Sequence, residues 1–406
     1  MNATVARRAL AVVALVASAA CSSVVESRAP EPGSPEPDSV AAAPVTVAAD
    51  TSVLETTAPS TTSTTSTATT APAAVPSTSE PDIAVATTTD VVVASSPPDR
   101  PDELAHLVQA VFFLALDNLA VSVSVRHPDG TTWQSSAGRR LDGEPVNSDT
   151  PFVQASVSKL VTAISIARLV ERGMLTDATP VPWTELGIAH HPAWDDVTVR
   201  ELLDHTSGMR PERTTWLDDP GPCTIPLTAV LGDPPTDERG TWRYSNGNYC
   251  ALGLLVEHLT GQPLDVAANE LVFGPAGIEG PYLTTEGLRP DSAPSPRGVG
   301  RLERLGAAGT WIMSTDDVVG MLAGVTDADL GVLRWPGIIA DQYGWGHTGT
   351  LDGAKACAWV LHDGTTIAAV VAGKRPASGG EVCDLVLPAL ALDLGVWAGE
   401  PEREPS

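Results

Sequence analysis

The chain has 406 residues, of which 43% are hydrophobic and 18% charged, and its 50 acidic residues against 24 basic ones give a formal net charge of −26. A chain this acidic repels phosphate backbones, so the composition argues against nucleic-acid binding. The length allows two or three domains, but roughly the first hundred residues are rich in Ser, Thr, Pro and Ala and nearly free of aromatics. About 300 residues remain for folded structure.

The N-terminus has the pattern of an export signal. Arg7 and Arg8 precede a run of small or apolar residues, Ala9 to Ala20, which suits a signal peptide over 1–20 and is too short to span a bilayer. The run Ser18-Ala19-Ala20-Cys21 resembles a bacterial lipobox, which implies a lipid anchor on Cys21 and a location on the extracytoplasmic face of the bacterial cell membrane. The alternative is cleavage after Ala17-Ser18-Ala19 and secretion.

Three further segments follow the signal peptide. Residues 21–100 are Ser/Thr/Pro-rich and predict a disordered, self-repelling tether. Residues 101–400 predict a folded domain, and 401–406 a short tail. Apart from Cys21, the cysteines of the chain are even in number and can pair in an oxidising compartment; they are Cys223, Cys250, Cys357 and Cys383.

Within the domain, strand patterns lie at both ends and helix patterns between them. Apolar residues at helical spacing predict a helix over 104–115, and the period-two run 121–125 before the turn Asp129-Gly130 predicts a hairpin. A second hairpin is predicted over 356–372, with its turn at Asp363-Gly364, and an apolar run predicts a helix over 382–394.

Three short motifs carry the chemistry. Ser156-Val157-Ser158-Lys159 stands directly before an apolar helical pattern that ends at Gly173. Residues three apart are neighbours on a helix, so a neutral lysine amine there can act as base for the serine hydroxyl. Alone, this motif is also compatible with a solvent-facing helix start. It is followed in order by Tyr244-Ser245-Asn246 and by His347-Thr348-Gly349-Thr350.

This order of motifs resembles that of the penicillin-recognising serine hydrolases, in particular the class C β-lactamase and D-alanyl-D-alanine carboxypeptidase branch. The resemblance covers about residues 104–394, and the segment Val197 to Met209, with its Leu-Leu-Asp-His-Thr-Ser-Gly core, is similar to a further family motif. It implies an α+β fold of the β-lactamase/transpeptidase type, in which both chain ends build an antiparallel sheet flanked by helices, with a helical region inserted.

The resemblance also implies roles for the motif residues. Ser156 would be the acylated nucleophile, Lys159 its proton acceptor, Tyr244 the phenol that relays protons to the leaving group, and Asn246 a partner of the substrate amide. His347 stands where many relatives have lysine, Thr348 and Gly349 would lie along the bound substrate, and the N–H groups of Ser156 and Thr350 would form the oxyanion hole. The His-Thr-Gly variant resembles carboxypeptidase and esterase-like members.

Other polar residues receive a structural interpretation. His205 belongs to the family's turn motif, and His190-His191 have no metal-ligand spacing around them, so we expect neither a metal nor a cofactor. A substrate carboxylate could be bound by an arginine in the interval before the third motif; the candidates are Arg297, Arg301, Arg304 and Arg334.

The four cysteines allow three connectivities, and their positions favour one of them. Cys223 and Cys250 bracket the segment that carries Tyr244, so a bridge between them would brace that motif. Cys357 and Cys383 would tie the strand after the third motif to the last helix. Disulfide mapping that joined Cys223 to Cys357 or Cys383 would reject this pairing.

The sequence thus predicts an extracytoplasmic serine hydrolase that acts through a Ser156 acyl-enzyme. The leading function is D-alanyl-D-alanine carboxypeptidase-like hydrolysis of peptidoglycan stem peptides, with β-lactamase or esterase activity as alternatives separated by the rate of deacylation and by substrate. A non-catalytic, penicillin-recognising binding module is the competing class. The expected partners are a peptide, β-lactam or ester substrate and the membrane, through the lipid anchor.

Overall fold

The computed structural model describes residues 91–92, 104–211, 214–295, 298–326, 329, 331 and 338–395. The predicted signal peptide (1–20), Cys21 and the tail (401–406) lie outside this range. Of the predicted tether, the described part is Val91–Val92, which forms the short strand β1. Within the described residues no helix combines the length and the apolar character needed to span a bilayer.

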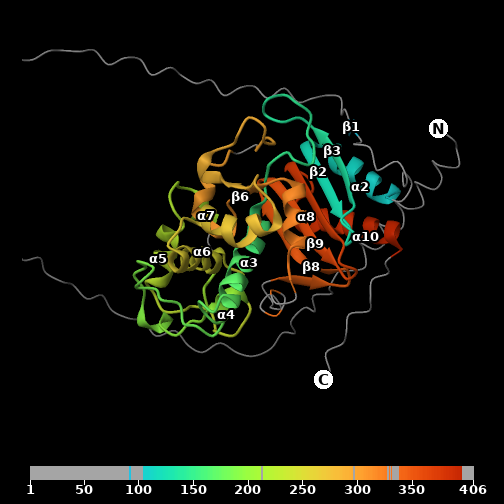
Figure 1. Ribbon diagram of the computed structural model, residues 1–406. Helices are drawn as coiled ribbons and strands as arrows, with labels where there is room; N and C mark the ends of the chain where they lie inside the picture. The colour runs from blue at the N-terminus through green and yellow to red at the C-terminus, as the bar shows by residue number, and fades with distance from the viewer. Residues whose placement is uncertain are drawn as a thin grey trace, which may run out of the picture. The chain divides into compact units, whose positions relative to one another are not determined.

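The described strands from both ends of the domain form one seven-stranded sheet (Figure 1). Its order is β1-β3-β2-β10-β9-β8-β7, and each neighbouring pair is antiparallel. The strands after β1 are β2 Asn118–Arg126, β3 Thr132–Gly138, β7 Ile339–Asp341, β8 Gly344–Leu351, β9 Gly353–Leu361 and β10 Thr366–Gly373. Both predicted hairpins are present, and the pairing of β2 with β10 joins them, which confirms the predicted sheet.

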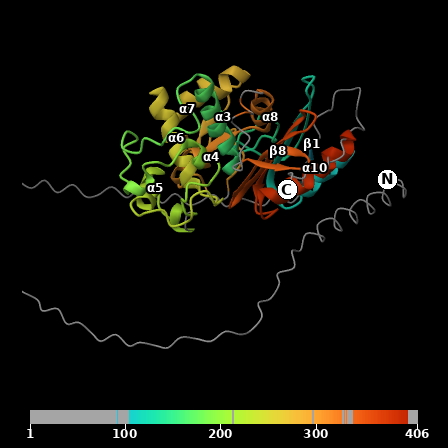
Figure 2. The ribbon, with the colours of Figure 1, turned by 90° about the horizontal axis from the view of Figure 1, so that it is seen from below.

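Strand β2 is buried on both faces because its two sets of side chains find different partners. Its valines pack against helices α2 (Ala105–Ala115) and α10 (Gly379–Leu394), which cover one face of the sheet side by side (Figure 2). Its serines face the opposite side, where the Oγ atoms of Ser122 and Ser124 lie 2.9 and 2.8 Å from Thr315 Oγ1. The hydroxyl groups satisfy one another, so this polar face can be buried.

The ends of α2 and α10 are joined by one carboxylate. Asp393, in the last turn of α10, accepts hydrogen bonds from the backbone N–H groups of His106 (3.1 Å) and Leu107 (2.9 Å), and His106 Nδ1 lies 2.6 Å from Asp393 Oδ1. The carboxylate therefore satisfies N–H groups that the first turn of α2 leaves without a helical partner. The two helices that begin and end the domain are held together.

Between β3 and β7 the chain forms the predicted helical region, with a small sheet of order β4-β6-β5. The strands of this sheet are β4 Phe152–Val153, β5 Tyr282–Leu283 and β6 Trp311–Met313. The α-helices are α3 Ser158–Glu171, α4 Val199–Leu203, α5 Thr224–Leu231, α6 Asn246–Thr260, α7 Leu264–Ala268 and α8 Thr315–Ala323. The short 3₁₀ turns are η1 Ala155–Val157, η2 Pro192–Trp194, η3 Thr214–Leu217, η5 Gly274–Ala276, η6 Thr284–Glu286 and η7 Leu302–Ala308, and η4 Asn269–Phe273 is a π-helical turn.

Helix α3 lies at the centre of the largest hydrophobic cluster and connects the helical region to the sheet. Almost every side of the helix is buried, and its apolar residues Leu160, Ile164 and Ile166 are each at most 2% exposed. The helix also buries hydroxyl groups, which find partners inside the protein, since Thr162 Oγ1 donates to Ala307 O and Ser165 Oγ to Val161 O. The nucleophile motif at its N-terminus is thereby placed where the sheet and the helical region meet.

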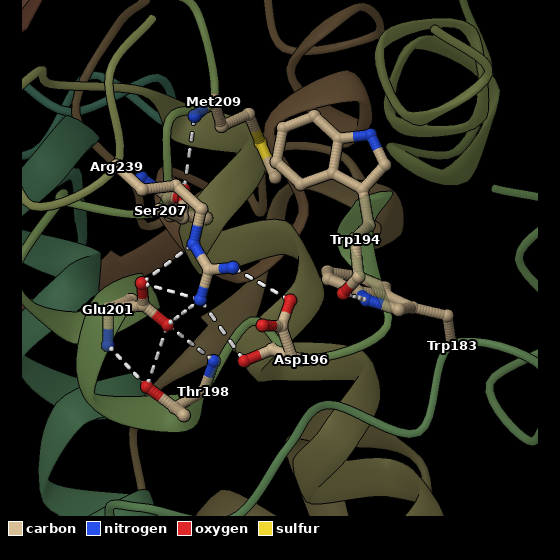
Figure 3. A network of polar contacts seen from close by, with 9 residues as sticks. Trp183, Trp194, Asp196, Thr198, Glu201, Ser207, Met209 and Arg239 are labelled. Atoms are coloured by element: carbon tan, nitrogen blue, oxygen red, sulfur yellow. Dashed lines mark hydrogen bonds and ion pairs between the residues drawn. The ribbon is translucent and has the colours of Figure 1, made fainter. Parts of the chain in front are cut away.

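A network of charged side chains anchors the loop that leads to Tyr244 (Figure 3). Thr198 and Glu201 form a capping box at the start of α4, in which Thr198 Oγ1 accepts from Glu201 N and Glu201 Oε2 accepts from Thr198 N. The Arg239 guanidinium donates to both oxygens of Glu201, at 2.9 and 2.8 Å, and to Asp196 Oδ1 at 2.7 Å. Residue 239 is thus fixed on α4, five positions before Tyr244.

Both predicted disulfides, Cys223–Cys250 and Cys357–Cys383, are present in the structure. The first joins the start of α5 to α6, the helix that follows Tyr244, and a Cβ at Gly306 would overlap Cys223 Sγ. The second joins β9 to α10. The first bridge therefore braces the helix that follows Tyr244. The second ties α10 to β9, the strand that pairs with β8 and its His347 motif.

Replacing Cys223 and Cys250 together by serine is expected to lower the free energy of unfolding by about 3 kcal/mol, because the bridge restricts a 27-residue loop in the unfolded chain. Urea denaturation of the oxidised wild type and the double variant measures this difference. The Cys357→Ser/Cys383→Ser variant is a matched comparison, since its sequence separation is 26 residues. Equal denaturation midpoints for wild type and the first variant would contradict the expectation.

Candidate active site

Ser156 lies in η1, directly before α3, and its turn is fixed on the small sheet. Gln154 donates from its backbone N–H to Trp311 O (3.0 Å) and from Nε2 to Met313 O (2.7 Å). Ala155 has a φ of 48°, in the left-handed region that non-glycine residues adopt at a cost of about 1–2 kcal/mol. A costly backbone conformation next to a partly exposed serine is typical of a turn that presents a reacting group.

Lys159, in the first turn of α3, is 1% exposed and has three oxygen atoms around its Nζ. Nζ lies 3.2 Å from Ser156 Oγ, 2.6 Å from Asn246 Oδ1 and 2.8 Å from Ala308 O. The amide and carbonyl oxygens can only accept, so a neutral amine would donate its two N–H bonds to them and present its lone pair to the Ser156 hydroxyl. This arrangement suits a base that removes the serine proton.

Tyr244 is the second group on the serine. Its phenol OH donates to Ser156 Oγ at 2.9 Å, and Lys159 Nζ lies 4.9 Å from the centre of its ring. Ser156 Oγ therefore accepts a hydrogen bond from Tyr244 while it can give its own proton to Lys159. The three residues form a short chain for proton transfer, assembled from η1, α3 and the segment just before α6.

His347 lies on β8 and is 4% exposed. Its Nδ1 lies 2.6 Å from Thr348 O, and since a carbonyl can only accept, Nδ1 carries the proton and Nε2 is left as an acceptor. Burial lowers the pKa of His347 to about 3. A solvent-exposed histidine is partly charged near neutral pH, whereas this one is neutral there because it is desolvated.

The low pKa of His347 predicts how stability depends on pH. Its folded-state value, about 3, lies below the ordinary 6.5, so the unfolded chain binds the proton first as the pH falls. We expect His347→Asn to reduce the loss of unfolding free energy between pH 6 and pH 4 by about 1.4 kcal/mol per pH unit. Urea denaturation at several pH values measures both slopes, and parallel slopes for wild type and variant would contradict this assignment.

Strand β8 runs directly beside the nucleophile turn. A Cβ at Gly349 would overlap the carbonyl oxygen of Gln154, so only glycine allows this approach. On the other side of the strand, Gly379 at the start of α10 packs equally close to the Gly349 backbone, and its N–H donates to Thr350 Oγ1 at 2.9 Å. The predicted site residues Thr348, Gly349 and Thr350 are therefore held next to Ser156 from both sides.

Sequence reasoning missed Ala308, whose main-chain oxygen binds Lys159, because a backbone carbonyl leaves no side-chain signal. Of the candidate arginines, Arg304 donates to Pro220 O at 3.1 and 2.9 Å, and Arg301 precedes η7, while Arg297 and Arg334 lie outside the described residues.

The adjacent histidines His190 and His191 form hydrogen bonds with residues close to them in the sequence. His190 Nε2 lies 2.8 Å from Asp195 Oδ1, and His191 Nδ1 accepts from Ala193 N.

A serine between a lysine and a tyrosine, at the junction of an antiparallel sheet and a helical region, defines a serine hydrolase with the β-lactamase/transpeptidase type of fold. The Beta-lactamase family model matches residues 113–334, more than half of the chain, and the chain belongs to this family. The predicted fold class and enzyme class are thereby confirmed.

Curated relatives include hydrolases and penicillin-binding proteins. Esterase EstB of Burkholderia gladioli is 32% identical over 206 residues, which cover 43% of this chain and 50% of the esterase. Penicillin-binding protein 4 of Amycolatopsis lactamdurans is 32% identical over 170 residues, which cover 40% of this chain and 44% of that protein. The putative penicillin-binding protein PbpX of Bacillus subtilis is 29% identical over 149 residues, 34% of this chain and 35% of its own length. The matches therefore span half or less of these relatives.

Solved structures with the same fold include a D-amino acid amidase and a protein in complex with D-Leu. A D-amino acid amidase from Ochrobactrum anthropi gives a TM-score of 0.58 at 20% identity and covers 71% of this chain and 98% of its own. The complex of SurE with D-Leu gives a TM-score of 0.59 at 24% identity, over 75% of this chain and 78% of SurE. At these identities the likeness establishes the fold alone.

Proposed function

We propose that the protein hydrolyses its substrates through an acyl-enzyme on Ser156. The observation that carries this proposal is the placement of Lys159 Nζ and Tyr244 OH at 3.2 and 2.9 Å from Ser156 Oγ. As Oγ bonds to the substrate carbonyl carbon, its proton passes to Lys159, and the leaving group departs with a proton relayed through Tyr244. Water then attacks the carbonyl carbon of the ester, the acyl–Oγ bond breaks, a proton returns to Oγ through Lys159, and the carboxylic acid product leaves. The backbone N–H groups of Ser156 and Thr350 would stabilise the oxyanion in both steps.

The substrate class that we propose first is a peptide with D-configured residues at the cleaved bond, as in D-alanyl-D-alanine carboxypeptidases acting on peptidoglycan stem peptides. The penicillin-binding proteins among the relatives support this choice, as do a D-amino acid amidase and a complex with D-Leu among the structural neighbours. Asn246 and strand β8, with Thr348 and Gly349, would bind the peptide backbone. A β-lactam would enter the same site as an acylating agent.

Esterase activity is the second candidate, and His347 favours it. With a pKa of about 3 the imidazole is neutral at pH 7, so this position offers a hydrogen-bonding group and no positive charge for a terminal carboxylate. The relative EstB is named as an esterase. A substrate without a carboxylate would lose no binding energy through the absence of a positive charge at this position.

We propose an extracytoplasmic location, with a signal peptide over 1–20 and a lipid anchor on Cys21. The two disulfides support folding in an oxidising compartment. Both N-terminal features lie outside the described residues and are tested by labelling cells with a radioactive fatty acid. Label in the wild type that is absent from Cys21→Ser supports the anchor, whereas unlabelled protein in the medium supports secretion.

Intact-mass spectrometry of the catalytic domain tests the acyl-enzyme. Wild type and Ser156→Ala are followed over time with benzylpenicillin and with an activated ester. A stable adduct on the wild type alone supports the carboxypeptidase, a short-lived adduct with released penicilloate indicates a β-lactamase, and ester turnover without a penicillin adduct indicates an esterase. If folded wild type is never acylated, the proposal fails and a non-catalytic binding module takes its place.

A pair of peptides separates the first two candidates further. One ends in D-alanyl-D-alanine and the other carries the same sequence with a terminal carboxamide. A carboxypeptidase that recognises the carboxylate prefers the free acid, an enzyme that needs no terminal charge cleaves both peptides at similar rates, and a strict esterase cleaves neither. His347→Lys introduces a cation at this position and is expected to shift the ratio of kcat/KM values towards the free acid.

A further inference from the structure

His205, which sequence reasoning assigned to a structural turn, holds the chain on both sides of Tyr244. The main-chain oxygen of His205 accepts from Arg243 N at 2.7 Å, and its Nδ1 accepts from Ser245 N at 3.3 Å. One residue thus binds the positions directly before and directly after Tyr244. Its φ of 58° lies in the left-handed region, where a residue other than glycine is strained.

The ring of His205 also packs against the phenol. Its centre lies 4.5 Å from that of Tyr244 and 5.2 Å from that of Tyr249, with tilts of 35° and 37°. The residue is 1% exposed, so the ring has no freedom to leave this position without disturbing the core. Together with the two backbone contacts, this stacking restricts the orientation of the Tyr244 side chain.

A second network fixes the protonation state of His205. Asn248 Oδ1 accepts from Ser207 Oγ at 2.7 Å, so its Nδ2 faces His205 Nδ1 at 3.0 Å and donates to it. Nδ1 therefore accepts two hydrogen bonds, and the ring proton is on Nε2. Burial lowers the pKa of His205 to about 2, so the ring remains an acceptor.

We infer that His205 is a positioning residue for Tyr244: it keeps the phenol oxygen within hydrogen-bond distance of Ser156 without touching the substrate itself. This inference rests on the proposed function, because it gives His205 an effect on catalysis only through the Tyr244 hydroxyl. Displacement of a proton-relay group by as little as 1 Å slows a reaction by about 100-fold. The role therefore has a kinetic signature that a purely structural turn lacks.

A double-mutant cycle with His205→Phe and Tyr244→Phe tests the inference in the full domain. Phenylalanine keeps a ring but cannot accept from Ser245 N. We expect His205→Phe to slow acylation by benzylpenicillin or an activated ester about 10- to 100-fold with little change in the apparent KM. In the Tyr244→Phe background the same change is expected to alter the rate by less than about 3-fold, since the hydroxyl that His205 positions is already missing.

Asparagine at position 205 provides the conservative variant. Its Oδ1 takes the place of Nδ1 and the residue tolerates a positive φ, so His205→Asn is expected to recover much of the acylation rate lost in His205→Phe. If His205→Phe does not fold, as judged by circular dichroism, His205→Gly takes its place in the cycle, because glycine adopts the positive φ and has neither a ring nor an acceptor. His191→Phe is the matched control: it removes another histidine Nδ1 that accepts a backbone N–H, at 3.1 Å, and should leave acylation unchanged.

The outcomes separate this inference from the proposed function. Equal losses from the His205 substitution in the wild-type and Tyr244→Phe backgrounds would mean that His205 acts on stability alone, and the inference would be overturned. If Tyr244→Phe by itself does not slow acylation, the proposed role of Tyr244 fails instead. Full activity of His205→Phe with Tyr244→Phe impaired would likewise overturn the inference while leaving the proposed function intact.

Discussion

Lys159→Met is expected to slow the acylation of Ser156 by about 1,000-fold or more, which is the largest kinetic effect that we expect beside loss of the serine itself. Methionine has a similar volume and no lone pair on nitrogen, so the hydroxyl loses its base while the buried space stays filled. The side chain also ceases to donate to Asn246 Oδ1 and Ala308 O. Stopped-flow measurement of acylation by an activated ester gives the rate directly.

The chain offers a matched control for this substitution. Lys355 is the other buried lysine among the described residues, at 3% exposed, and its Nζ donates to Gly373 O at 2.7 Å in the sheet. Lys355→Met should lower the thermal midpoint and leave the acylation rate of the folded protein within a few-fold of wild type. Comparable rates for Lys159→Met and Lys355→Met would contradict the assignment of Lys159 as the base.

Gly349→Ala is expected to lower kcat by about 100-fold, because it separates the two parts of the proposed oxyanion hole. The new Cβ would overlap Gln154 O, and β8 cannot move away since Gly379 and α10 lie against its other face. The backbone of Gly349 is not left-handed, so the effect comes from crowding alone. Steady-state kinetics with a small ester, whose binding needs few contacts, measures the loss in kcat.

Gly138→Ala controls for the general cost of such a collision. A Cβ at Gly138 would overlap the main chain at Leu119, and the φ of Gly138 is 99°. The substitution therefore destabilises the pairing of β3 with β2. We expect a lower thermal midpoint with unchanged kcat. If the two alanine variants lose the same stability and Gly349→Ala retains its kcat, the strand is not part of the oxyanion hole.

The fold was largely predictable because its signals are local. The alternation in β2, the turn at Asp129-Gly130 and the helical period of α3 each depend on a few neighbouring residues, and the elements appear with nearly the expected bounds. The burial of both faces of β2 was not apparent from its sequence. It depends on the hydroxyl group of Thr315, almost 200 positions away, which contacts both serines and allows the serine-lined face to be as buried as the valine-lined one.

The site residues whose side chains belong to a sequence motif could be predicted. The contacts made by main-chain atoms could not. Ser156, Lys159, Tyr244 and Asn246 form one chain of hydrogen bonds, in which Lys159 contacts Ser156 and Asn246, and Tyr244 contacts Ser156. The oxygen of Ala308 and the two backbone contacts of His205 follow from the path of distant segments. His347 shows a third case, since its neutral state depends on burial that the sequence does not display.

The Asp393 carboxylate holds the start of α2 next to the end of α10. Because Asp393 binds the N–H groups of His106 and Leu107, a short linker could connect residue 395 to residue 104 without crossing the site. New ends could then be opened at the exposed turn Asp129-Gly130, between two strands of the sheet. Such a circular permutant would keep every contact around Ser156 and could carry a fused partner at its new ends.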